Sequence, residues 1–107
     1  MSTRACFTLR IRPGMLADYQ RHHATVWPEM LEALREAGWG NYSLFAAPDG
    51  LVVGYLETES FERSLALMEA TEVNARWQAL MQPYFELPDG ERPDTVMVPL
   101  QEYFHLD

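Results

Sequence analysis

The stretch NYSLFAAPDGLVVGYLE, residues 41–57, decides the fold of this chain. Its two β-prone segments, residues 41–46 and 51–57, are joined by APDG at positions 47–50. Proline presets the first corner of a tight turn, and aspartate and glycine are favoured turn residues. The stretch therefore predicts a β-hairpin in the middle of the chain.

Upstream of the hairpin, the pattern predicts one strand followed by one long helix. Residues 5–11 alternate between apolar and polar side chains and stop at a Pro-Gly pair. Across residues 15–37 the apolar positions recur at steps of three and four, and Gly38 is a suitable helix stop. Pro28 lies inside this segment and removes a backbone donor, so we expect the helix to open or kink there.

Downstream, residues 60–81 are helical by the same criterion, with an interruption near Thr71, which is suited to cap a second piece. Residues 83–99 contain four prolines and are predicted to be loop, and residues 100–106 are predicted to be the last strand. The order β-α-β-β-α-β is that of a ferredoxin-like α+β domain, with both helical segments on one face of an antiparallel sheet.

Apolar residues fall on both phases of the predicted strands, for instance Leu44 with Phe45 and Tyr103 with Phe104. Imperfect alternation is the simpler explanation. The alternative is that a second copy of the chain covers part of the sheet face without helices, and we favour that homodimer.

Composition limits the number of domains, the compartment and the partners. A chain of 107 residues is the size of one domain, 1–107, and no segment is apolar enough for a signal peptide or a membrane span. Sixteen acidic residues against eight basic ones, all arginine, disfavour nucleic acid and anionic membranes as partners. Cys6 is the only cysteine, which excludes an intramolecular disulfide and is consistent with a cytoplasmic protein.

The stretch DYQRHHATVWPEM, residues 18–30, contains two adjacent histidines. Consecutive helical residues project about 100° apart, so both cannot face the same way. Projection places Tyr19 and His23 on the apolar stripe, and His22 at its edge near Asp18. His23 is therefore the candidate for proton transfer, and His22 is expected to be solvated or paired with Asp18.

A structural role is the simpler interpretation of His23 from spacing alone, with its ring bonded to a carbonyl or to Tyr19. Polar residues on a stripe that would suit aliphatic ones, together with the break at Pro28, point instead to the wall of a pocket. A metal site formed by His22, His23 and His105 would need adjacent helix positions to converge, which disfavours it. Neither a phosphate loop nor a local Ser-His-Asp signature is present.

An ordered set of short motifs resembles the L-rhamnose mutarotase family over nearly the whole chain. The set is Tyr19, His23, Trp27-Pro28-Glu29, Gly40-Asn41-Tyr42, Arg76-Trp77 and Leu100-Gln101-Glu102-Tyr103-Phe104. The resemblance implies a ferredoxin-like domain that pairs into a dimeric α+β barrel. It also implies an isomerase that interconverts the α and β anomers of L-rhamnopyranose without a cofactor or a metal.

The resemblance also assigns roles by position. His23 looks like the catalytic proton donor, and Tyr19, Tyr42 and Trp77 look like sugar-binding residues. The family often has a second tryptophan where this chain has Gln78. An amide bonds a hydroxyl but offers no stacking face, so Gln78 is a further candidate for substrate binding and the preferred sugar stays open.

The chemistry needs a proton delivered to the ring oxygen while another leaves the anomeric hydroxyl, and one imidazole can supply both transfers. Asn41, Gln78 and Glu102 are candidates for binding hydroxyls. Two other functions remain: a cofactor-free monooxygenase or cyclase acting on an aromatic substrate, and a non-catalytic small-molecule binding module. All three functions suit this fold, so our preference for the mutarotase depends on the ordered residue match.

Overall fold

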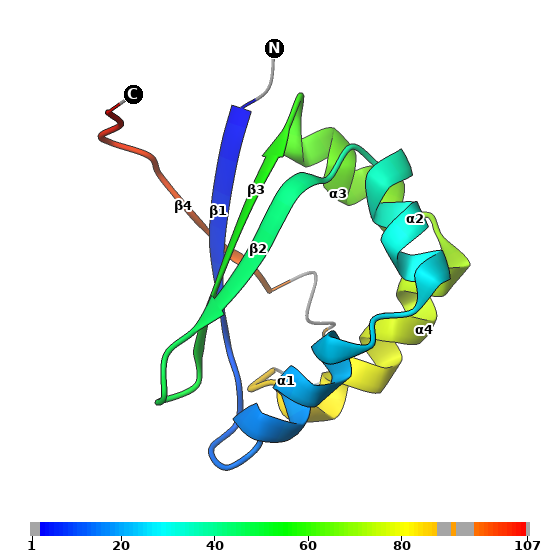
Figure 1. The fold of residues 1–107 in the computed structure, drawn as a ribbon, viewed down its shortest axis with the longest axis vertical. Helices are drawn as coiled ribbons and strands as arrows, with labels where there is room; N and C mark the ends of the chain where they lie inside the picture. The colour runs from blue at the N-terminus through cyan, green and yellow to red at the C-terminus, as the bar shows by residue number, and fades with distance from the viewer. Residues whose placement is uncertain (1–2, 88–90, 92–95, 107) are drawn as a thin grey trace.

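A computed structural model describes residues 3–87, 91 and 96–106, which form a four-stranded antiparallel sheet with helices on one face (Figure 1). The sheet order is β2-β3-β1-β4. The elements are β1 (Thr3–Arg10), α1 (Leu16–Ala24), α2 (Pro28–Glu36), β2 (Gly40–Ala46), β3 (Leu51–Thr58), α3 (Phe61–Glu69), α4 (Glu72–Met81), the 3-10 helix η1 (Gln82–Tyr84) and β4 (Val98–Leu100). This confirms the predicted ferredoxin-like α+β fold.

The predicted hairpin is confirmed, and its turn depends on one glycine. The Ala47 N–H donates to the Leu51 carbonyl at 2.8 Å and the Gly50 N–H to the Ala47 carbonyl at 3.0 Å. Gly50 has φ +97°, and a Cβ there would lie 2.7 Å from the Ile11 carbonyl oxygen. Only glycine fits this position without strain.

The first helical segment is two helices, so the prediction of one helix over residues 15–37 is wrong. Pro28 is the first residue of α2, where its missing N–H removes no helical hydrogen bond. Trp27, just before it, has φ −56° and ψ 135°, the extended conformation that a following proline favours. Gly38 ends α2 as predicted, and its N–H donates to the Arg35 carbonyl at 3.0 Å. The proline thus begins a helix rather than kinking one.

The second helical segment is divided as predicted. The Thr71 hydroxyl accepts a hydrogen bond from the Asn74 N–H at 3.3 Å and donates one to the Met68 carbonyl at 2.8 Å. Ser60 caps α3 in a similar way, accepting from the Arg63 N–H at 3.2 Å. In the described part of the chain, no helix has the length and hydrophobicity needed to cross a bilayer.

The last strand lies earlier than predicted. It spans Val98–Leu100, and residues 101–106 form no regular strand. Pro99 faces Phe7 in the register of β4 and β1. Proline is tolerated on an edge strand, so the proline-rich character of residues 83–99 did not exclude a strand at their end. Residues 88–90 and 92–95 of that predicted loop lie outside the described residues.

The core lies between the sheet and the helices and is built around Phe7. The Phe7 ring is fully buried, stacks on Phe61 at 6.2 Å between centroids, and lies 6.4 Å from both Trp39 and Tyr42. Gly54 makes room for it, because a Cβ there would come within 2.2 Å of the Phe7 ring. This aromatic packing supports Trp39 and Tyr42, both of which border a cavity.

Candidate active site

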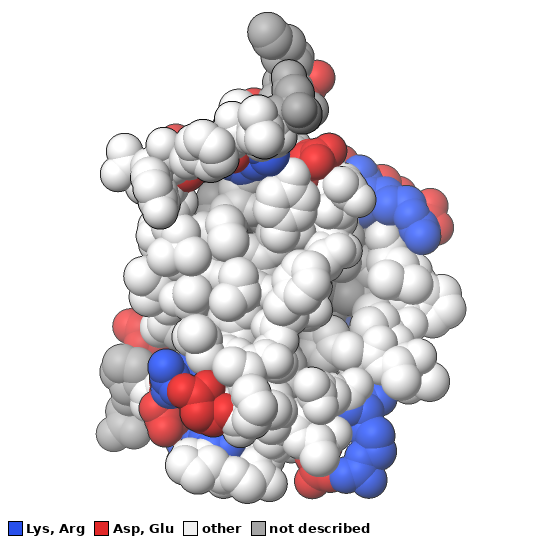
Figure 2. Space-filling model, turned by 60° about the vertical axis from the view of Figure 1, so that its left-hand side comes forward, with Lys and Arg blue, Asp and Glu red and all other residues white. Residues whose placement is uncertain are grey.

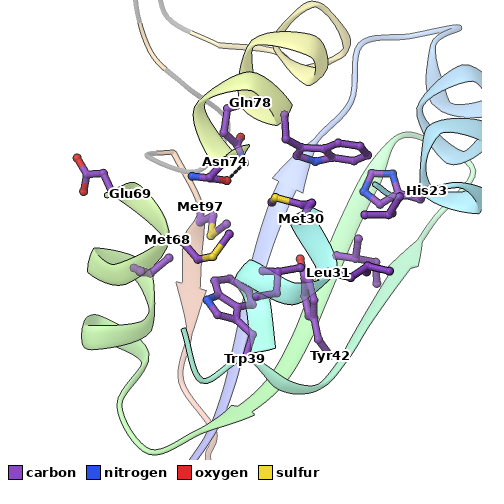
Figure 3. A pocket seen from close by; sticks show the side chains of 15 residues that line it. His23, Met30, Leu31, Trp39, Tyr42, Met68, Glu69, Asn74, Gln78 and Met97 are labelled. Atoms are coloured by element: carbon purple, nitrogen blue, oxygen red, sulfur yellow. Dashed lines mark hydrogen bonds between the residues drawn. The ribbon is translucent and has the colours of Figure 1, made fainter. Parts of the chain in front are cut away.

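A cavity of about 340 Å³ lies between the helices and the sheet (Figure 3). This volume is in the range of small-molecule sites. Most of its wall is aliphatic, methionine and tryptophan side chains, and the ionisable or amide side chains that line it are His23, Tyr42, Glu69, Asn74 and Gln78. The predicted site residues His23, Tyr42, Trp77 and Gln78 are therefore brought together in one cavity.

His23 lines the cavity from the end of α1. Its Nδ1 lies 3.1 Å from the Tyr19 carbonyl oxygen. A carbonyl only accepts hydrogen bonds, so Nδ1 carries the hydrogen and the neutral ring keeps its lone pair on Nε2. Burial lowers the pKa of His23 below 6.5, the bond to the Tyr19 carbonyl acts in the opposite direction, and His22 lowers the pKa further. Near neutral pH, His23 is therefore a base rather than a cation.

His22 is half-buried and does not pair with Asp18, which corrects the predicted pairing. Its Nε2 shares a hydrogen bond of 3.0 Å with the Tyr84 hydroxyl, and the two rings meet edge to face. Asp18 pairs with Arg21 instead. The contact joins α1 to η1 across 62 positions of the chain, so no local spacing indicates it.

Tyr19 lies behind His23. It is buried, its ring centroid is 4.5 Å from that of His23, and its ring also meets Phe85 edge to face at 5.3 Å between centroids. Tyr19 is not among the described residues that line the cavity. Burial raises the pKa of Tyr19 to about 12. Burial and the nearby Tyr19 also raise the pKa of Tyr42, so both hydroxyls stay protonated near neutral pH.

Trp77 is buried in α4 and connects two of the sequence motifs. Its ring meets His23 edge to face at 5.5 Å and Trp27 at 5.1 Å. The neighbouring Arg76 lies over the Trp27 ring at 5.7 Å and pairs with Glu29 at 3.3 Å. The Trp-Pro-Glu and Arg-Trp motifs therefore meet in space and hold α2 against α4.

Gln78 follows Trp77 and donates a hydrogen bond from Nε2 to Asn74 Oδ1 at 3.0 Å. Sequence reasoning missed Asn74 and Glu69 as lining residues. Asn74 and Gln78 are four residues apart on one helix, and this spacing would have indicated Asn74 as a neighbour of Gln78.

Two other candidates for binding hydroxyls lie elsewhere. Asn41 donates to Glu57 at 3.1 Å, and Glu102 pairs with Arg4 at 2.6 Å, both at exposed positions. Neither borders the cavity. Within residues 3–87, 91 and 96–106, no three His, Cys, Asp or Glu side chains are grouped so as to hold a metal ion.

Known proteins resemble this chain along nearly its whole length. The family model described as L-rhamnose mutarotase matches residues 4–106. The L-rhamnose mutarotase of Lachnoclostridium phytofermentans is 33% identical over 105 residues, which is 97% of this chain and 98% of that protein. The L-rhamnose mutarotase of Pectobacterium carotovorum subsp. carotovorum is 35% identical over 105 residues, with the same two coverages.

Solved structures agree on the fold. A crystal structure of L-rhamnose mutarotase from Formosa agariphila superposes with a TM-score of 0.81 at 21% identity, covering 98% of this chain and 99% of that one. A putative antibiotic biosynthesis monooxygenase from Bordetella bronchiseptica gives a TM-score of 0.68 at 15% identity, covering 96% and 98%. At these identities the likeness shows the fold alone.

Proposed function

The chain belongs to the L-rhamnose mutarotase family, and on that premise we propose that it is an isomerase that interconverts the α and β anomers of L-rhamnopyranose in this cavity. The observation that carries the proposal is the match over residues 4–106 to that family. The placement of His23 in the cavity wall, with Nε2 as its basic nitrogen, supports the same function.

Neutral His23 begins the reaction as a base. Its Nε2 takes the proton of the anomeric hydroxyl while the bond between the anomeric carbon and the ring oxygen breaks. The proton then passes to the ring oxygen, directly or through water, which gives the open aldehyde with a hydroxyl on C5. Rotation about the C1–C2 bond presents the other face of the aldehyde, and the reverse steps close the ring as the opposite anomer.

The other site residues bind or support the sugar in this proposal. Trp77 packs against an apolar face of the ring, and Tyr42 and Gln78 bond hydroxyls. Tyr19 contributes behind His23, because its carbonyl orients the imidazole and its ring fills the space beneath it. The fold likeness to the monooxygenase is at 15% identity and does not favour oxygen chemistry over anomer exchange.

We further propose that the chain is one domain, that it works in the cytoplasm, and that two copies pair through the open sheet face. The single cysteine, Cys6, is a free thiol, as suits a reducing compartment. The face without helices carries exposed apolar side chains, including Phe45 and Leu100.

The test compares anomer exchange of L-rhamnose with and without the protein in the same weak buffer. Mutarotation proceeds unaided in water, so saturation transfer between the two anomeric proton signals is the measurement. We expect an acceleration well above the buffer rate, unchanged by a chelator. If no aldose in a panel exchanges faster than in buffer, the proposal is wrong, and oxygen uptake with aromatic substrates should be measured next.

A further inference from the structure

Two amides on α4 form a second polar group in the cavity. Asn74 and Gln78 lie one helical turn apart and are hydrogen-bonded to each other at 3.0 Å. Both border the cavity, as does His23 from α1. In Figure 3 the amide pair and His23 are on different sides of the view, with Met30 between them. His23 on α1 and the amide pair on α4 are thus two of the places where a largely apolar wall carries polar groups, besides Tyr42 and Glu69.

The hydrogen bond between the two amides holds the Gln78 side chain against a buried partner. Asn74 is only 2% exposed, and burying an amide is unfavourable unless its polar atoms are bonded. Gln78 satisfies the Asn74 oxygen with one of its two N–H groups. A side-chain amide also has a second N–H and an accepting oxygen. In the described part of the chain Gln78 bonds only to Asn74, so no other described residue uses its second N–H or its oxygen, and the half-buried side chain borders the cavity.

The shape of a pyranose relates His23 to the amide pair. The anomeric carbon and the ring oxygen form one edge of the ring, and C3 and C4, each with a hydroxyl, form the opposite edge. When the anomeric edge is at His23, the C3–C4 edge is directed away from it. An amide that offers one donor and one acceptor matches two neighbouring hydroxyls.

We propose that Gln78, positioned by Asn74, binds the hydroxyls on C3 and C4 and selects sugars that carry both. The inference rests on the proposed function and adds a specificity-determining site to it. It assigns to the enzyme aldopyranoses with an intact 3,4-diol, and it gives the anomeric edge to His23.

The experiment removes the hydroxyl and the amide separately and together. Exchange rates per enzyme, corrected for the buffer rate of each sugar, are measured for L-rhamnose and for its 2-deoxy, 3-deoxy and 4-deoxy analogues. The proteins are the wild type, Gln78→Met, which keeps the side-chain length, and Gln82→Met. Gln82 is exposed and lies outside the cavity, so Gln82→Met is the matched control.

We expect the wild type to lose roughly three- to tenfold when the C3 or C4 hydroxyl is removed, as for a neutral hydrogen bond. With L-rhamnose, Gln78→Met should have an exchange rate lower than that of the wild type by a similar factor. With the 3-deoxy or 4-deoxy sugar, the variant and the wild type should have the same rate. That non-additivity marks a direct contact. The effect of 2-deoxygenation should stay independent of Gln78, and Gln82→Met should behave as the wild type. Asn74→Leu, a second variant, should lose the same discrimination while still accelerating the deoxy sugars.

Additive losses for both the 3-deoxy and the 4-deoxy sugar would overturn the inference, as would non-additivity with the 2-deoxy sugar alone. Either result leaves the proposed function in place, because L-rhamnose is still exchanged by the wild type. A wild type that does not accelerate L-rhamnose at all rejects the function, and the inference with it.

Discussion

At the scale of single residues, the two adjacent histidines have different environments and should respond differently to substitution. His23→Ala should lower the accelerated exchange by about 10²- to 10⁴-fold, since a positioned acid–base group contributes that much. His22→Ala should keep most of the activity, because the His22 ring is hydrogen-bonded to Tyr84 and does not line the cavity. Saturation transfer with L-rhamnose measures both variants.

The control for this comparison is stability. Thermal unfolding should show that both variants are folded at the assay temperature. Equal losses of activity in the two folded variants, or a larger loss in His22→Ala, would show that His23 is not the group that moves the proton.

The acidity of His23 predicts the pH dependence. Burial lowers its pKa below 6.5, so the base form is lost only below that value, and the acidic limb of the rate should have its midpoint below 6.5. The same shift affects stability. Between the lowered pKa and 6.5 the unfolded chain binds more protons than the folded chain, so stability falls as the pH falls through that window.

A titration of the His23 imidazole followed by NMR measures its pKa directly. In His22→Gln the midpoint of His23 should move up, because His22 contributes to lowering the pKa, but burial is the larger cause and should keep it below 6.5. A midpoint above 6.5 in the wild type would contradict a buried, neutral base.

At this scale the sequence predicted features that depend on nearby residues and missed contacts between residues far apart in the chain. The place of His23 in a cavity wall was predicted because its position on the apolar stripe is a property of one helix. The bond between His22 and Tyr84 spans 62 positions and has no local signal. Glu69 reaches the cavity from a third helix, and only the tertiary packing of α3 places it there.

At the scale of elements, local chemistry predicted the hairpin and the helix boundaries near Gly38 and Thr71, because turn and cap residues act within a few positions. Two elements were misjudged where a proline has more than one compatible place. Pro28 suits the first position of a helix as well as a kink, and Pro99 suits an edge strand as well as a loop. The register of β4 depends on β1, which lies at the other end of the chain.

The cap at Thr71 carries a stability prediction. Thr71→Ala should lower the free energy of unfolding by about 0.5–2 kcal/mol, because the N–H of Asn74 and the carbonyl of Met68 both lose a partner. Thr71→Ser should retain most of it. Ser60→Ala is the matched comparison at α3 and should cost less, since Ser60 accepts one cap bond from Arg63.

Urea unfolding at a fixed pH measures the three variants against the wild type. If Thr71→Ala unfolds at the wild-type urea concentration, the hydroxyl does not hold the start of α4. The comparison matters for the site because α4 carries the Trp77 and Gln78 side chains.

At the scale of the whole molecule, the open face of the sheet has two rows of side chains across the strands. Paired residues in an antiparallel sheet project to the same side. One row is Phe45, Val53, Thr8 and Val98, and the next is Ser43, Tyr55, Cys6 and Leu100. Figure 2 shows the uncharged centre of this side of the molecule, with the charged residues towards its margins.

The C-terminal segment extends the same surface. Residues 101–106 leave the body of the molecule beyond β4 (Figure 1), and Tyr103 is 96% exposed. An exposed apolar surface of this kind is typical of an interaction site. A second copy of the chain is the occupant that we propose.

The homodimer itself is the last prediction. Each chain has a net charge of −8, so association must overcome repulsion between two acidic copies, and the apolar rows must supply the free energy. Phe45 is 63% exposed, so Phe45→Glu should leave the fold of each chain intact while placing a charge in a desolvated interface. Leu67→Glu, at an exposed leucine of α3, is the control. Sedimentation at micromolar concentration should give twice the chain mass for the wild type and Leu67→Glu, and the chain mass for Phe45→Glu. Added salt should strengthen the dimer, because it screens the repulsion. A wild type that sediments as a monomer at every salt concentration would show that the open face is not an interface between copies.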